Sequence, residues 1–155
     1  MSHKPHISNS FSSQNTPRYK EKIGSAYPRT ASNPNQFLEE KISWKVNSLD
    51  FDGTHGWNRL EDIKVLYLQV VTRMKLFEAM TWQEIIDTGS HPINVADIIK
   101  EAQKRLDALG IYEDQLFSFR ITGKKRMWGI RDRHIFKILW WDPDHKICPS
   151  PKKNT

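Results

Sequence analysis

The sequence lacks several features that would assign it to a common class of protein. Its single cysteine, Cys148, excludes an internal disulfide framework and an all-cysteine metal site. No apolar run approaches the roughly 18 residues of a membrane span, and residues 1–5 do not begin the apolar core of a signal peptide. P-loop, GxSxG, HExxH and CxxC motifs are also missing. We therefore expect a cytoplasmic protein with no membrane partner and no cofactor.

The 155-residue chain has a formal net charge of +6, which is unevenly distributed. Residues 1–38 carry five Lys or Arg and one Glu, and residues 148–155 carry two Lys. Between these ends the 17 basic residues balance 17 acidic ones, but residues 39–114 have a net charge of −5 and residues 115–147 one of +5. The positive charge that bears on a binding surface therefore lies in residues 115–147.

Composition divides the chain into three parts. Residues 1–38 are rich in Ser, Asn, Gln, Thr and Pro, and their apolar residues show no period. Such a segment buries too little surface to offset its ordering entropy, which predicts a disordered basic tail. Residues 39–147 are of the right length for one domain, and residues 148–155 read as a second short disordered tail.

The first half of this domain predicts one strand followed by helices. Ile42, Trp44 and Val46 alternate with polar residues, which is the pattern of a half-buried strand. Apolar residues at three- and four-residue spacings predict an amphipathic helix from 60 to 77 and another from 94 to 109. Between them, the capping-box sequence that begins at Thr81 predicts a short helix over 81–87.

The second half predicts three strands, over residues 117–122, 127–131 and 135–141. Short turns separate them, so we expect antiparallel hairpins. The last strand is apolar on both sides apart from Lys137, which indicates a central position in the sheet. The prediction is an α+β fold of order β-α-α-β-β-β, an antiparallel sheet with helices packed on one face.

This order of elements over residues 42–147 resembles the RelE/ParE superfamily of small toxins. In that family the first strand returns to the sheet, and a Leu/Ile-x-Gly turn precedes a strand that carries arginine. The stretch Phe119–Arg131 is similar to this part of the family, with Ile121-Thr-Gly123 in the place of the turn. The chain is also similar to uncharacterised small bacterial and phage proteins. It departs from the family in its long N-terminal tail, in the additional helix over 81–87 and in the segment Trp140–His145.

The resemblance implies an endoribonuclease that cleaves messenger RNA without a metal, using the RNA 2′-OH as nucleophile. It further implies RNA or the ribosome, and a cognate antitoxin protein, as partners. This chemistry needs a base, an acid and cations near the phosphate, and we assign these catalytic roles to Arg120, Arg131 and His145. The candidate RNA-binding residues are Lys124, Lys125, Arg126, Arg133, Lys137 and Trp141.

Simpler interpretations of the same residues stay open. Lys and Arg at hairpin tips commonly serve only to solvate the turn. The segment Asp142–His145 fits a turn that ends a strand with a capped backbone, and Trp141 fits the core. Asp142, Asp144 and His145 are metal-ligand types but too few for a site, so we predict no metal. A non-catalytic protein-interaction module is the alternative function, whereas DNA binding is disfavoured because the predicted helices are not the basic elements.

Overall fold

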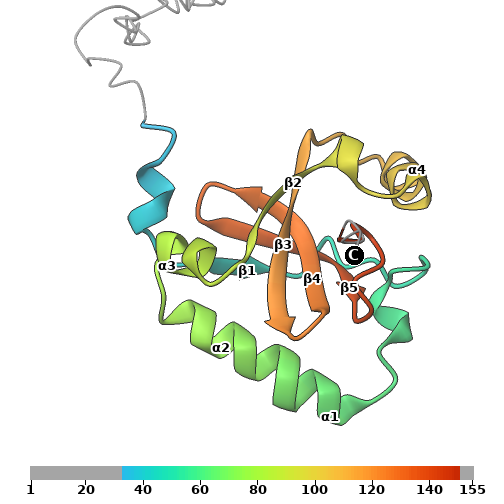
Figure 1. Cartoon of the computed structure of the whole chain (residues 1–155), viewed down its shortest axis with the longest axis horizontal. Helices are drawn as coiled ribbons and strands as arrows, with labels where there is room; N and C mark the ends of the chain where they lie inside the picture. Colours follow the sequence, from blue (N-terminus) through green and yellow to red (C-terminus); the bar gives the residue numbers. More distant parts are fainter. Residues whose placement is uncertain (1–32, 151–155) are drawn as a thin grey trace, which may run out of the picture. The chain divides into compact units, whose positions relative to one another are not determined.

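The structure is a computed structural model that describes residues 33–150. Its centre is one five-stranded sheet (Figure 1). The strands are β1 (Ser43–Lys45), β2 (His91–Asn94), β3 (Gln115–Thr122), β4 (Lys125–Asp132) and β5 (Ile135–Asp142). Their order in the sheet is β1-β5-β4-β3-β2, with β1 parallel to β5 and every other pair antiparallel. The predicted α+β class and its antiparallel meander are therefore confirmed.

Helical segments fill the connections. They are η1 (Gln36–Glu39), η2 (Trp57–Arg59), α1 (Ile63–Val65), η3 (Leu66–Val71), α2 (Thr72–Glu78), α3 (Trp82–Asp87), η4 (Val95–Asp97) and α4 (Lys100–Leu109). α1, η3 and α2 follow one another without a break, so they form the single long helix that the apolar spacing predicts. The π-helical stretch η3 lies in the middle of this helix.

The predicted helix over 94–109 is shorter in the structure, because strand β2 and the 3-10 turn η4 replace its start. β2 lies at the edge of the sheet and pairs only with β3. Pro92 is acceptable there, since an edge strand has one side without ladder hydrogen bonds. The sheet thus has one strand more than the predicted order contains.

The prediction that the helices pack on one face of the sheet needs correction, because both faces are covered. α2 and α3 cover the face that carries Phe117, Phe119 and Phe136. α4 covers the opposite face, where Trp128 and Trp140 are fully buried. Figure 1 shows α1 and α2 on one side of the strands and α4 on the other. The physical reason is that the meander strands are apolar on both sides, so each face needs a cover.

The folded unit begins slightly before the predicted boundary at residue 39. Phe37 in η1 packs edge-on against Trp82, with 6.1 Å between the ring centroids. The guanidinium of Arg131 lies 3.7 Å from the centre of the Phe37 ring. The remainder of the two predicted tails, residues 1–32 and 151–155, lies outside the described residues.

Replacing Thr81 by Ala is expected to destabilise the fold by about 1 kcal/mol. The predicted capping box is present, since the Thr81 hydroxyl accepts from the Glu84 N–H at 3.3 Å and the Thr81 N–H donates to the Glu84 carboxylate at 2.7 Å. Urea denaturation measures the change. Thr54→Ala, at an exposed loop position, is the matched control and should change the unfolding free energy by less than about 0.5 kcal/mol. Equal effects of the two substitutions would contradict a capping role.

Candidate nucleic-acid interface

Arg120 and Arg126 lie directly opposite each other in the β3–β4 ladder. Opposed residues of an antiparallel pair point to the same side, so both guanidinium groups lie on the face away from Phe119. Burial, and then the charge of Arg120, lowers the pKa of Arg126. Within residues 33–150, neither arginine forms an ion pair with a carboxylate. Two like charges placed in this way destabilise a sheet, and an anion bound between them would relieve that repulsion.

Asp142 lies opposite Arg126 in the β4–β5 ladder, and its charge raises the pKa of Arg126 against the larger effects of burial and of Arg120, but it forms no direct ion pair with either arginine. Its side chain is buried and accepts hydrogen bonds from Trp128 Nε1 at 3.3 Å and from the backbone N–H groups of Lys146 and Ile147 at 2.8 and 3.0 Å. These bonds stabilise the turn after β5. Of the interpretations of Asp142–His145, the capped, strand-terminating turn is therefore the one that the structure contains.

Two histidines lie close to the arginine pair. His145 follows β5 in a left-handed conformation, with φ of 56°. Burial lowers the pKa of His145, and the charge of Arg126 and the nearby His91 lower it further. His91 is in β2, where it pairs with Ser118 of β3. The sequence alone does not identify His91, because only the pairing of β2 with β3 places it beside these residues.

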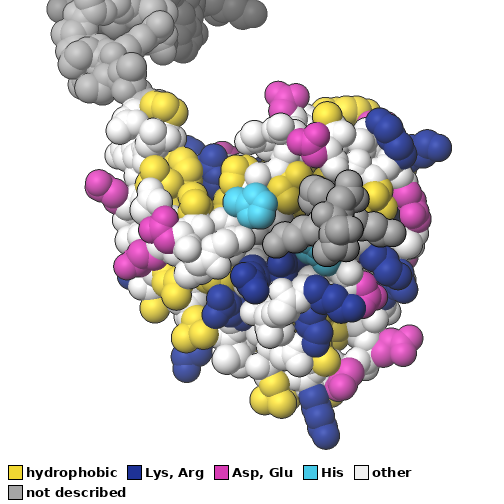
Figure 2. All heavy atoms as spheres, viewed as in Figure 1, with side chains coloured by type: hydrophobic (Ala, Val, Ile, Leu, Met, Phe, Trp, Pro, Cys, Tyr) yellow, Lys and Arg dark blue, Asp and Glu magenta, His cyan; other side chains and the backbone are white. Residues whose placement is uncertain are grey.

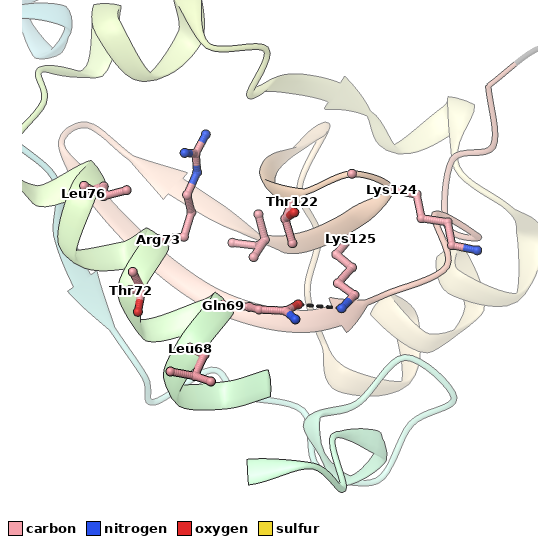
Figure 3. Close-up of a pocket in the computed structure, with 10 residues that line it drawn as sticks. Leu68, Gln69, Thr72, Arg73, Leu76, Thr122, Lys124 and Lys125 are labelled. Carbon is pink, nitrogen blue, oxygen red and sulfur yellow. Dashed lines mark hydrogen bonds between the residues drawn. The ribbon is translucent and has the colours of Figure 1, made fainter. Parts of the chain in front are cut away.

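A groove of about 570 Å³ separates the long helix from the β3–β4 hairpin (Figure 3). Lys125 reaches across it and donates from Nζ to Gln69 Oε1 at 2.5 Å. Arg73 Nε donates to the backbone oxygen of Arg120 at 3.4 Å, so the groove reaches the β3 backbone, while the Arg120 guanidinium lies on the opposite face of the sheet. Lys124 lines the end of the groove and forms an exposed ion pair with Asp144 at 3.6 Å. None of the lining residues is acidic.

We refer to these residues together as the basic hairpin surface. Figure 2 shows Lys and Arg side chains gathered over the region of β3 and β4, below a histidine. The surface extends over both faces at the turn end of the β3–β4 hairpin: Arg73 and Lys125 lie on the side of the long helix, Lys124 lies in the turn, and His91, Arg120, Arg126 and His145 lie on the opposite side. Five of these seven residues belong to the predicted site. Arg73 and His91 are additions that depend on contacts between elements distant in sequence.

The structure does not bring the predicted catalytic residues Arg120, Arg131 and His145 together. Arg131 pairs with Phe136 in the ladder and contacts Phe37, so it lies on the opposite face of the sheet from Arg120. The proposed catalytic set is therefore not one site, because it is divided by the sheet itself.

Two of the predicted RNA-binding residues lie at the other end of the hairpins. Arg133 is in the β4–β5 turn with φ of 55°, and its Nε lies 3.9 Å from the Asp132 carboxylate. Lys137 Nζ lies 3.6 Å from the same carboxylate. Arg133 and Lys137 therefore share the Asp132 carboxylate, whereas Arg120 and Arg126 form no ion pair among residues 33–150.

Trp141 is not accessible to a nucleic-acid base. Its side chain is buried and stacks on Trp57 with 5.5 Å between ring centroids. Trp140 is buried on the opposite face, where its Nε1 donates to Asp50 at 2.9 Å. The two tryptophans do point to opposite faces, but both faces are core.

Comparisons of the chain with family models, with curated proteins and with solved structures find no match. Among residues 33–150, no three His, Cys, Asp or Glu side chains gather closely enough to hold a metal ion. In the same part of the chain, no helix has the length and apolar character to cross a membrane. The geometry of the basic hairpin surface is therefore the basis for inferring a function.

Proposed function

We propose that the protein binds RNA through the basic hairpin surface. The observation that carries this proposal is the opposed pair Arg120 and Arg126, which forms no direct ion pair with a carboxylate within residues 33–150. The planar, forked guanidinium matches phosphate oxygens. Lys124 in the turn and Lys125, which points to the other face of the sheet, add further positive charge at the same end of the hairpin, and several spaced cations suit a chain of phosphates better than a single anion.

RNA binding is one part of the toxin-like function that the resemblance implies, and cleavage is the other. The basic hairpin surface supports binding directly, because Arg120 and Arg126 are opposed in the ladder and Lys124 and Lys125 immediately precede Arg126. For cleavage it offers His145 and His91 beside Arg126, in place of a set that includes Arg131. We therefore propose binding as the function and follow cleavage as a second readout of the same experiment.

The Arg120→Gln/Arg126→Gln double variant is expected to bind a short single-stranded RNA at least about tenfold more weakly than the unaltered chain. Charge-assisted contacts to phosphate are lost, and the slope of log K against log salt should become less negative by about 1.4. Fluorescence anisotropy between about 50 and 200 mM salt measures both quantities. The variant relieves the repulsion but loses the bonds from Arg126 Nη1 to the backbone oxygens of Gly123 and Lys125, at 2.7 and 3.1 Å, so its melting temperature is measured beside the affinity and must stay well above the assay temperature.

The matched control is the Lys45→Gln/Lys104→Gln double variant. It removes the same charge from β1 and α4, outside the basic hairpin surface, and both side chains are exposed. Its affinity should fall by less than about threefold, because only the long-range field changes. Equal losses in the two double variants would show that binding reports net charge alone. An unaltered chain that binds no RNA contradicts the proposal outright, and a gel of the bound RNA shows whether it is cut.

A protein-interaction module is the second candidate function, and one observation favours it. The long helix exposes large apolar side chains, with Ile63, Leu68 and Val71 exposed by 65, 69 and 50%, and Leu68 lies at the rim of the groove. A contiguous apolar patch on a helix commonly marks a contact with another protein. A chain that binds no RNA but is recovered with a stoichiometric partner, which Leu68→Ser releases, would favour this function over RNA binding.

A further inference from the structure

Two arginines and two histidines form a cluster on one face of the sheet, beside the β3–β4 turn. Arg120 and Arg126 are opposed in the ladder, and His91 is opposed to Ser118, two residues before Arg120, so all three side chains lie on the same face. Burial lowers the pKa of His145, and the charges of Arg126 and His91 lower it further, which places His145 near both. We call His91, Arg120, Arg126 and His145 the arginine–histidine cluster.

The segment that leads into β2 is fixed against Arg120. The Arg120 N–H donates to Oγ of the fully buried Ser90 at 3.1 Å. Gly89 has φ of 96°, and a Cβ atom there would lie 3.8 Å from Arg120 Nη1. His91 Nδ1 lies 3.2 Å from the backbone oxygen of the same glycine. The guanidinium of Arg120 and the ring of His91 are therefore neighbours, which completes the cluster on the side of β2.

The arginine–histidine cluster has an excess of positive charge. Among residues 33–150, none of its four side chains forms an ion pair. Asp142 is a carboxylate whose charge acts on Arg126 and His145, but its oxygens already accept from one indole and two backbone N–H groups. Together with Asp142, the cluster has a formal charge of +1 with neutral histidines and +3 with both protonated. A dianion therefore balances the cluster once one histidine is protonated.

A phosphate at the end of an RNA suits this cluster better than a phosphate within the chain. An internal phosphodiester has one negative charge and two free oxygens. A phosphate monoester has three free oxygens and a charge of about −1.5 to −2 at pH 7. The four side chains come from β2, β3, β4 and the segment after β5, so they approach a ligand from separate strands. Arg126 and His145 are also half-buried, and a chain end reaches such groups without continuing past them.

We infer that the arginine–histidine cluster binds the phosphate monoester at one end of an RNA chain. This inference rests on the proposed RNA binding and names the part of the RNA that the arginine pair holds. The planar forks of Arg120 and Arg126 each match two phosphate oxygens, and a protonated histidine donates to the third. Lys124, in the adjoining turn, adds positive charge for the phosphates of the nucleotides that follow.

The experiment uses two pairs of fluorescent hexacytidylates and the full chain. One pair is labelled at the 3′ end and differs in the 5′-phosphate, and the other is labelled at the 5′ end and differs in the 3′-phosphate. In one of the pairs, the phosphorylated oligonucleotide is expected to bind at least about tenfold more tightly than its partner, and that pair identifies the end. An octacytidylate without a terminal phosphate is the control for charge. It adds two internal phosphates and should bind less than about threefold more tightly than the hexamer.

Arg120→Lys tests the arginine fork, since it keeps the charge and removes the planar pair of donors. The readout is the ratio of the affinities for the phosphorylated and unphosphorylated hexamers, which should fall at least about threefold. Arg133→Lys makes the same change in the β4–β5 turn, at the other end of the hairpins, and should leave the ratio unaltered.

His145→Asn tests the histidine, because asparagine tolerates the left-handed φ of 56° at this position. In the unaltered chain the ratio should rise between about pH 8 and about pH 6.5, where the phosphate is still largely a dianion and favours a protonated histidine. The bound dianion then opposes the effects of burial, Arg126 and His91 on His145, and it acts in the same direction as Asp142. The rise should shrink in His145→Asn and persist in His134→Asn, a matched change in the β4–β5 turn.

The outcomes separate the inference from the proposed function. Equal affinities within both pairs, or a gain that the octacytidylate matches, overturn the inference and leave RNA binding intact. A preference that survives both Arg120→Lys and His145→Asn places the phosphate elsewhere and also overturns it. Inorganic phosphate that displaces the phosphorylated hexamer at an equal concentration and constant ionic strength would identify a site for the free anion instead. A chain that binds none of the oligonucleotides overturns the proposed function and the inference with it.

Discussion

Replacing Asp50 by Asn is expected to destabilise the fold by about 3 kcal/mol. The carboxylate is 4% exposed and accepts from Arg105 Nε and Nη2 at 2.9 and 2.8 Å and from Trp140 Nε1 at 2.9 Å. The backbone N–H groups of Asp52 and Gly53 donate to the same carboxylate. An amide at this position has one acceptor in place of two and turns its NH₂ group toward donors. The expected cost lies at the lower end for a broken buried pair, because the Arg105 side chain is 30% exposed.

Asp144→Asn is the matched control for this substitution. Asp144 forms an ion pair with Lys124 at 3.6 Å, but both side chains are at least half exposed. An exposed pair of this kind contributes less than about 1 kcal/mol. Urea denaturation of both variants measures the difference. Similar losses at Asp50 and Asp144 would show that the buried pair has no special role in the fold.

The same carboxylate predicts a dependence of stability on pH. The hydrogen bonds from Arg105 are the largest cause that holds the pKa of Asp50 well below its usual range. Because the pKa is lower in the folded state, this contribution is complete above about pH 5, where the carboxyl is fully ionised in the unfolded chain as well. It decreases as the pH falls from there toward the folded pKa. The stability difference between the unaltered chain and Asp50→Asn should therefore shrink as the pH falls below about 5, and a constant difference would contradict this linkage.

The meander and the long helix were predictable because local patterns determine them. Phe117, Phe119 and Ile121 alternate along β3, and Gly123 turns the chain with φ of 51° into β4. β2 was not predictable, because its four residues include Pro92 and show no period. It is a strand only because β3 offers it a partner, and that is a tertiary effect.

The candidate site was predicted in part, and the part that failed depends on register. Lys124, Lys125 and Arg126 are consecutive, so their common position at the hairpin was evident from the sequence. Arg131 was grouped with Arg120 by proximity in sequence. The ladder pairs Arg120 with Arg126, and Arg131 is five residues beyond Arg126. An odd spacing along a strand reverses the face, so Arg131 points to the other side.

The burial of Trp140 and Trp141 has a related cause. A strand with one solvated face would expose one of two consecutive tryptophans, which was the basis for a base-stacking role at Trp141. Because α4 covers the second face, both sides of β5 are buried at Trp140 and Trp141. The position of α4 follows from β2, which the sequence pattern does not contain.

Replacing Gly129 by Ala is expected to destabilise the fold by about 3 kcal/mol or more. A Cβ atom at this position would lie 2.2 Å from the backbone oxygen of Lys137 and 2.5 Å from Cζ of Phe136. Gly129 pairs with Ile138 where the β4–β5 register shifts, so β5 must move to admit the methyl group. Backbone oxygen does not yield as a flexible side chain would. The neighbouring pair Trp128 and Trp140 should then change its near-ultraviolet circular dichroism together with the loss of stability.

Gly110→Ala distinguishes a steric clash from the general effect of losing a glycine. Gly110 ends α4 with φ of 70°, and a Cβ there would meet no atom within 4 Å. Its substitution should therefore cost only the strain of a left-handed alanine, about 1 kcal/mol, with no change in the tryptophan signal. If Gly129→Ala costs no more than Gly110→Ala, the close approach of β5 to Gly129 is not a constraint on the sheet. That result would mean that the Lys137 backbone oxygen can move to make room for a methyl group. The register shift would then be maintained by the buried side chains around it, above all Trp128 and Trp140.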